Sequence, residues 1–146
     1  MRRFLVLVVI FLTVVSCDLK DDCGECFTPP RQFNFEFVDK VTEENLFVNN
    51  TFDKDAIVVI DENDDDVSFQ IIFYNEKYIL SLSEIGWELD PKVYTVKLSD
   101  EVSVIFELDM DNISANCCSY FAVEAFNLQT YEYTESTVTG IIEVKI

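Results

Sequence analysis

The chain contains no histidine, and glycine, proline and basic residues are scarce among its 146 residues. It has 3 glycines, 3 prolines and 10 lysine or arginine residues, against 28 aspartate or glutamate residues. Without imidazole, the sequence lacks the base of the serine and cysteine triads and the histidine ligands of many zinc sites. The formal charge of −18 repels phosphate groups and therefore argues against a nucleic-acid partner.

The first 17 residues have the features of an export signal. Arg2 and Arg3 form a positive end, and the 14 residues from Phe4 to Cys17 carry no charge. A helix of this length covers about 21 Å, which is less than the roughly 30 Å of a bilayer's hydrocarbon core. A cleaved signal peptide is therefore favoured over a permanent transmembrane helix.

Val14-Val15-Ser16-Cys17 resembles the lipobox of bacterial lipoproteins. The resemblance implies that residues 1–16 are removed, that the Cys17 thiol is acylated and that Cys17 becomes the new N-terminus. Two or three acyl chains would hold such a protein on a membrane essentially permanently. The alternative is a plain signal peptide that ends next to a cysteine by chance.

The residues after Cys17 bear on which membrane carries the protein. Asp18-Leu19-Lys20-Asp21-Asp22 is similar to the signal of surface-exported lipoproteins of the Bacteroidetes type, which implies an outer-membrane protein on the cell surface. A periplasm-facing position is the alternative, and an acidic residue directly after the cysteine, as Asp18 is, resembles an inner-membrane retention signal of enterobacteria. Removal of the leader takes two of the 10 basic side chains and leaves 28 acidic ones, so the formal charge becomes −20. The acyl chains, and not the acidic protein surface, should therefore attach the protein to the membrane.

Residues 32–146 have the pattern of an all-β domain, preceded by an acidic tether at 17–31. Phe33, Phe35 and Phe37 alternate with polar or smaller residues, which predicts one buried face of a strand. Asn75-Glu76 predicts a tight hairpin. No helical period of useful length occurs, so we expect a single antiparallel β-sandwich of immunoglobulin-like kind with seven or eight strands. Beyond the phenylalanine strand, the expected strands are 56–60, 67–74, 78–83, 93–98, 102–108, 118–128 and 141–146.

Four cysteines remain once Cys17 is assigned to lipid, and disulfides are the favoured interpretation in an exported protein. They are Cys23, Cys26, Cys117 and Cys118. Cys23 and Cys26 have the CxxC spacing of redox proteins, but the prolines that follow disfavour the helix which lowers a catalytic thiol's pKa. Thiolate metal binding is a further alternative, although Cys117 and Cys118 are adjacent and face opposite ways on a strand. The pairing stays open at this point.

The densest acidic segment, residues 61–66, is the candidate metal site. Asp61, Asn63 and Asp65 match the first three oxygen ligands of an EF-hand-like calcium loop. Asp66 replaces the glycine that makes the turn, and Ile72 replaces the glutamate that closes the shell. A solvated turn is therefore favoured, with weak calcium binding as the alternative and no other cofactor expected. A thinner cluster of the same kind contains Asp109, Asp111 and Asn112.

Four aromatic side chains are candidates for a sugar-stacking platform, although large aromatic residues are more often buried. They are Trp87, Tyr94, Tyr131 and Tyr133. A carboxylate pair could in principle support glycan chemistry, but with 28 acids such pairs arise by chance. No catalytic residue is therefore assigned.

The sequence predicts a non-catalytic envelope lipoprotein that binds or assembles with an unidentified protein or glycan partner. A calcium- or carbohydrate-binding surface module is the main alternative, and a carboxylate-based glycan-active enzyme is the other. The assembly hypothesis makes a specific structural prediction, namely an accessible edge strand without protection by lysine or proline.

Overall fold

The computed structural model describes residues 27–115 and 118–146, and this part of the chain forms strands and no helix. The strands are β1 (Phe27–Thr28), β2 (Phe33–Val38), β3 (Val58–Asp61), β4 (Gln70–Tyr74), β5 (Lys77–Leu82), β6 (Lys92–Lys97), β7 (Ser103–Ala115), β8 (Cys118–Leu128), β9 (Glu132–Glu135) and β10 (Ile141–Lys145). The all-β prediction is confirmed. The described residues hold no helix long and apolar enough to cross a membrane.

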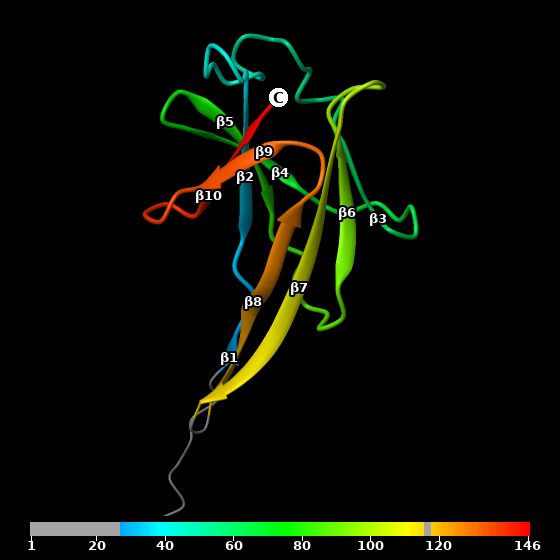
Figure 1. The fold of residues 1–146 in the computed structure, drawn as a ribbon, viewed down its shortest axis with the longest axis vertical. Helices are drawn as coiled ribbons and strands as arrows, with labels where there is room; N and C mark the ends of the chain where they lie inside the picture. Colours follow the sequence, from blue (N-terminus) through cyan, green and yellow to red (C-terminus); the bar gives the residue numbers. More distant parts are fainter. Residues whose placement is uncertain (1–26, 116–117) are drawn as a thin grey trace, which may run out of the picture.

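The strands form two five-stranded sheets that pack against each other (Figure 1). Sheet A has the order β1-β8-β7-β6-β3, and sheet B has the order β4-β5-β2-β10-β9. The rings of Phe35 in sheet B and Phe106 in sheet A lie 5.1 Å apart, so the inner faces share one core. Two sheets packed in this way form a β-sandwich.

The described strands number ten, whereas the sequence predicted seven or eight. All eight predicted strands are present, and β1 and β9 are additional. β1 has 2 residues and β9 has 4, which is too short for an alternating pattern to stand out. Because β1 lies within the segment predicted as tether, the paired part of the chain begins before residue 32.

The sequence predicted antiparallel strands, but some of the strand pairs are parallel. β10 runs parallel to β2 from Ile141 opposite Asn34 to Lys145 opposite Val38, and β1 runs parallel to β8. The remaining pairs are antiparallel. Alternation along one strand reports which face is buried but not the direction of its neighbour, so the parallel pairs could not be read from it.

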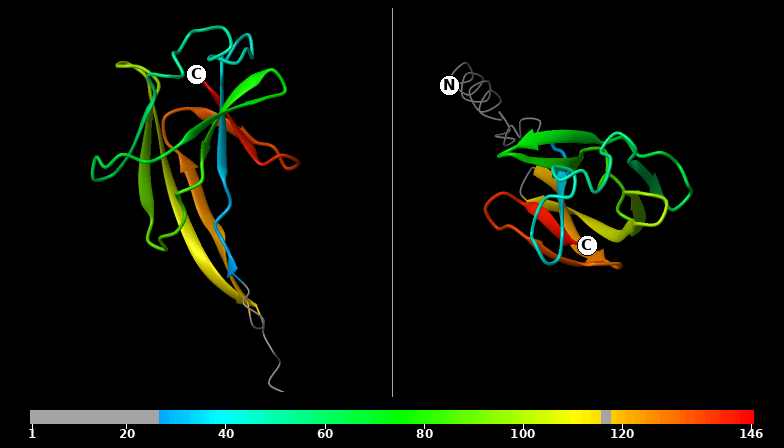
Figure 2. Two further views of the ribbon diagram at one scale, coloured as in Figure 1. Left: turned by 180° about the vertical axis from the view of Figure 1, so that it is seen from behind. Right: turned by 90° about the horizontal axis from the view of Figure 1, so that it is seen from above.

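β7 and β8 form a long hairpin that extends beyond the rest of both sheets (Figures 1 and 2). β7 continues to Ala115, although the sequence predicted that it would end near residue 108. Asp109, Asp111 and Asn112 therefore lie within a strand, opposite Ala125, Ala122 and Phe121, and their interpretation as a turn is wrong. Pairing with β8 along the whole hairpin outweighs the low strand propensity of aspartate and asparagine.

The core is rich in phenylalanine, as the sequence predicted. Phe33, Phe35 and Phe37 are completely buried, which confirms the inward face of β2. Phe106 lies at the centre of an aromatic cluster, with its ring 5.1 Å from that of Phe35 and 5.5 Å from that of Phe126. This cluster joins β2 to β7 and β8 and so connects the two sheets.

Candidate functional site

Four strands lie at the edges of the two sheets, and β4 differs from the other three. β1 has 2 residues. The outer side of β3 is covered by the segment after it, since Val67 donates its N–H to the Val59 carbonyl at 2.9 Å. β9 carries glutamates at both ends. β4, with the sequence Gln-Ile-Ile-Phe-Tyr, has neither charge nor proline, which are the usual protections of an edge strand.

Within residues 27–115 and 118–146, no backbone group pairs with the outer side of β4. Asn75 and Glu76 have φ of 49° and 63°, and Tyr74 pairs with Lys77, which is the two-residue hairpin that the sequence predicted. The residues that flank such a turn, here Tyr74 and Lys77, form a hydrogen-bonded pair. Hydrogen-bonded and non-hydrogen-bonded pairs then alternate along the two strands. The N–H and C=O groups of Ile71 and Phe73 therefore point away from β5. They are available to an added strand.

The side chains of β4 are exposed on both faces. Ile72 and Tyr74 lie on the outer face of sheet B and are 38% and 51% exposed. Phe73 lies on the opposite face and is 62% exposed, with its ring 4.9 Å from that of Tyr78. An exposed apolar strand of this kind is rare on a protein that has no partner at that edge.

Beside Phe73 the surface has a groove of about 640 Å³, here called the Phe73 groove. Its walls come from β4, β5 and the loop between β2 and β3. The Lys54 ammonium lies 6.0 Å from the Tyr78 ring and 2.8 Å from an Asp55 carboxylate oxygen, and this bond raises the pKa of Lys54 above its ordinary value. The residues that line the groove include Phe47, Phe52, Lys54, Phe73, Glu76 and Tyr78.

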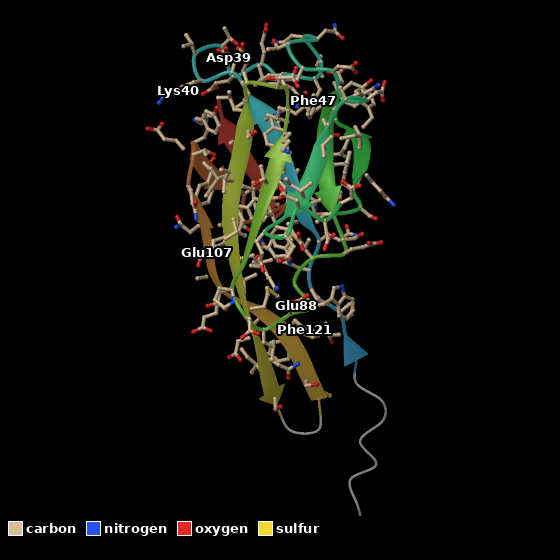
Figure 3. The ribbon with its side chains drawn as sticks, turned by 90° about the vertical axis from the view of Figure 1, so that its right-hand side faces the viewer. Asp39, Lys40, Phe47, Glu88, Glu107 and Phe121 are labelled. Carbon is tan, nitrogen blue, oxygen red and sulfur yellow. The ribbon has the colours of Figure 1, made fainter. Side chains whose placement is uncertain are left out.

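Asn45 fixes the loop that forms one wall of the groove. Its side-chain nitrogen donates to the Tyr78 carbonyl at 3.0 Å, and its side-chain oxygen accepts the N–H groups of Phe47 and Val48 at 3.2 Å each. Asn45 is buried, so these bonds are shielded from water. The loop therefore holds a defined shape next to β5, at the end of the molecule where Figure 3 shows Phe47. No pattern in the sequence indicated this role of Asn45.

A second hollow crosses the outer face of sheet B. Two adjoining depressions of about 310 and 330 Å³ share Tyr74, Ile79, Thr139 and Ile141. Glu36 lies in the floor, almost fully buried, and its carboxylate is 2.8 Å from the Lys77 ammonium. Tyr74 thus belongs both to the β4 edge and to this hollow.

The acidic turn at 61–66 is built from hydrogen bonds within the protein. The Asp61 carboxylate accepts the N–H groups of Asn63 at 2.8 Å and Asp65 at 3.0 Å, and these bonds lower its pKa, that from Asp65 most. Glu62 accepts a bond from the Lys92 ammonium at 2.8 Å, which is the main cause of its lowered pKa. Asp61 is thus engaged as a turn cap, as in a solvated turn. In the described ranges, no group of three or more acidic, cysteine or histidine side chains is placed to hold a metal ion.

The four candidate platform aromatics do not share one surface. Tyr94 is buried, and its ring packs 5.4 Å from that of Phe106 in the core. Tyr131 and Tyr133 are partly buried against the same core, and the Tyr133 hydroxyl donates to the Phe126 carbonyl at 3.2 Å. Trp87 is exposed but packs edge-on against Phe121, which Figure 3 shows toward the hairpin end.

The lipidation site and most of the cysteines lie outside the described residues. This applies to Cys17, Cys23, Cys26 and Cys117. Cys118 is the first residue of β8 and is half-buried.

Comparison with family models, with curated proteins and with solved structures gave no match for this chain.

Proposed function

We propose that this protein is an exported, lipid-anchored binding protein without a catalytic role, and that it holds an extended segment of a partner protein along β4. The observation that carries the binding role is the β4 edge. It combines backbone groups of Ile71 and Phe73 that point away from β5, exposed apolar side chains and the Phe73 groove. Strand addition uses these elements: backbone hydrogen bonds give affinity, and pockets for alternate side chains give specificity.

The charge of the chain indicates the chemistry of the partner. A second cleaved copy would also carry a formal charge of −20, and repulsion between two such chains disfavours their pairing. The proposed occupant is instead a segment with alternating apolar residues and basic residues at its ends. Apolar side chains of that segment would enter the Phe73 groove, beside Asp53 and Glu76.

The proposed location comes from the leader. Arg2, Arg3 and the lipobox ending at Cys17 support cleavage, acylation and attachment to the outer membrane, with the domain on the cell surface. The expected product is a membrane-bound chain that begins at acylated Cys17. Intact mass measurement of the membrane-extracted protein tests this, and protease treatment of whole cells tests surface display. A Cys17→Ser variant should lose the acyl mass and leave the membrane.

The strand order supports an immunoglobulin-like arrangement of the sandwich. In that fold, strands D, E and B are neighbours in one sheet and strands C, F and G in the other. The orders β4-β5-β2 and β3-β6-β7 correspond to these two runs when β2 is taken as B. β8, β9 and β10 are then additions, and β10 lies beside β2 where strand A would lie.

A peptide-binding measurement on the full chain in detergent tests the binding role. The probe is a labelled nine-residue peptide of alternating valine and threonine with lysines at both ends, followed by fluorescence anisotropy. Ile72→Lys places a charge on the proposed edge and should weaken binding by at least about tenfold, or 1.4 kcal/mol. Val58→Lys is the matched control, because Val58 is 40% exposed on β3, an edge of the other sheet, and the change in charge is the same.

A second probe separates strand addition from simple charge attraction. The same peptide with alternate amides N-methylated keeps its lysines but cannot donate the ladder hydrogen bonds, and it should bind at least about tenfold more weakly. Equal binding of the two peptides, or an equal loss in both lysine variants, would overturn the proposal. Concentration-dependent dimerisation abolished by Ile72→Lys would make a second copy the occupant and would overturn the proposed partner.

A further inference from the structure

The hollow on the outer face of sheet B has the size and the apolar walls of a small-molecule site. Tyr74, Ile79 and Ile141 line both of its depressions. Ile79 is only 5% exposed, although the next residue of β5, Leu80, is the one that points into the core. The depressions of about 310 and 330 Å³ lie at the lower end of the range of such sites, which is about 300 to 1,000 Å³.

Each acidic side chain that lines the hollow already has a cation beside it. The pairs are Glu36 with Lys77, Glu135 with Arg31 and Glu143 with Lys145, with nitrogen-to-oxygen distances of 2.8, 2.6 and 3.7 Å. A cationic ligand would have to displace one of these side chains from its carboxylate. An anionic ligand would be repelled by the strong negative charge of the chain. The hollow therefore favours an uncharged ligand.

Two polar groups of the hollow can bind such a ligand. The Asn34 side-chain oxygen is buried and accepts no hydrogen bond from the residues that the structure describes, which is costly for an amide. Rotation about the soft terminal torsion of Asn34 would turn this oxygen toward the hollow. The Lys77 ammonium has three N–H donors on a side chain that is 46% exposed, so it can serve Glu36 and a ligand together. Asn34 and Glu36 are alternate residues of β2 and lie about 6.6 Å apart on one face, so one ligand can reach both ends of the hollow.

From these features we propose that the hollow binds an uncharged sugar unit of a glycan. A hydroxyl group both donates and accepts hydrogen bonds, which matches an acceptor at Asn34 and a donor at Lys77. The C–H groups of a sugar ring are apolar and pack on an exposed aromatic ring, which Tyr74 supplies at 51% exposure. The site does not depend on strand addition, because Phe73 and its groove lie on the opposite face of sheet B.

An array of immobilised neutral and acidic oligosaccharides tests the proposal, with the full chain applied in a detergent that has no sugar head group. We expect binding to neutral members, and titration calorimetry then measures the affinity for the neutral oligosaccharide that gives the strongest signal. Asn34→Leu should weaken this binding at least about fivefold, as the loss of one hydrogen bond does, without lowering the midpoint of urea unfolding. Asn127→Leu is the matched control, because Asn127 is exposed on β8 in the other sheet, and it should bind like the natural protein.

Phe73→Ala separates the sugar site from the proposed peptide edge. It should leave the affinity for the oligosaccharide unchanged and weaken binding of the valine-threonine peptide, whereas Asn34→Leu should do the reverse. Sugar binding without peptide binding would support the hollow and count against strand addition. Four results would overturn the sugar site: no binding to any neutral member of the array, a preference for acidic members, unchanged affinity in Asn34→Leu, or an equal loss in Asn127→Leu.

Discussion

The Lys77 ammonium lies 2.8 Å from Glu36 Oε1, and the two side chains differ greatly in exposure, at 46% for Lys77 and 6% for Glu36. They join β5 to β2 on the outer face of sheet B. A buried carboxylate is costly without a cationic partner, whereas a half-exposed lysine alone costs little. Lys77→Met should therefore destabilise the fold by about 1 to 3 kcal/mol, which the midpoint of urea unfolding measures.

The double variant Glu36→Gln with Lys77→Met supplies the control for this pair. It removes the buried charge together with its partner and should recover most of the lost stability. An unchanged unfolding midpoint in Lys77→Met alone would mean that water, not the ammonium, satisfies Glu36.

The hairpin turn beside β4 offers a stabilising substitution. Glu76 has a φ of 63°, which costs a residue with a side chain roughly 1 kcal/mol and costs glycine nothing. Asn-Gly is the preferred sequence for such a turn, so Glu76→Gly should raise the free energy of unfolding by up to about 1 kcal/mol. Glu84→Gly serves as the comparison, because Glu84 is an exposed loop residue without positive φ and should gain nothing. Equal effects at both positions would contradict the role of the backbone angle.

The strands that could be predicted from sequence are those with a clear inner face. Phe33, Phe35 and Phe37 are buried as expected, because a period of two identifies the core side of a strand directly. The hairpin at Asn75 was predictable from its local chemistry. The extension of β7 past residue 108 was not, because Asp109 and Asp111 disfavour strands on their own and are held there by β8.

The sequence predicted that an unprotected edge strand could exist, but it did not identify which strand would lie at the edge. The absence of charge in Gln70–Tyr74 is visible in the sequence, yet the strand order that leaves β4 at an edge depends on pairings between distant segments. Burial of Tyr94 likewise follows from the packing of β6 on the core, so the proposed platform could not be tested without the fold. Local pattern gave the elements, and long-range pairing decided which of them are exposed.

The aromatic core gives a prediction that separates stability from binding. Phe106 is completely buried and its ring lies 5.1 Å from that of Phe35, so Phe106→Ala should cost about 3 to 5 kcal/mol. Phe73 is 62% exposed, and Phe73→Ala should cost less than about 1 kcal/mol while it weakens binding of the valine-threonine peptide. Urea unfolding and fluorescence anisotropy measure the two effects. A large loss of stability in Phe73→Ala would show that its ring belongs to the core and not to a binding edge.

The acidic turn at 61–66 predicts how the stability of the fold depends on pH. Hydrogen bonds from the N–H groups of Asp65 and Asn63 lower the pKa of Asp61 in the folded state. A carboxyl group whose pKa is lower in the folded state stabilises the fold at pH values above its pKa in the unfolded chain. This stabilisation is lost as the pH falls through the pKa of the folded state. The advantage of the natural protein over Asp61→Asn should therefore be constant from pH 5 to 8 and shrink below roughly pH 4.

Unfolding curves of both proteins across this pH range measure the change. Asp64→Asn is the control, because Asp64 has a φ of 62°, which asparagine tolerates, and lies in the same turn. Because the Asp61 carboxylate already caps the turn, a calcium chelator should leave the unfolding midpoint at pH 7 unchanged. A lower midpoint in chelator, restored by calcium and absent in Asp61→Asn, would instead establish the turn as a calcium site.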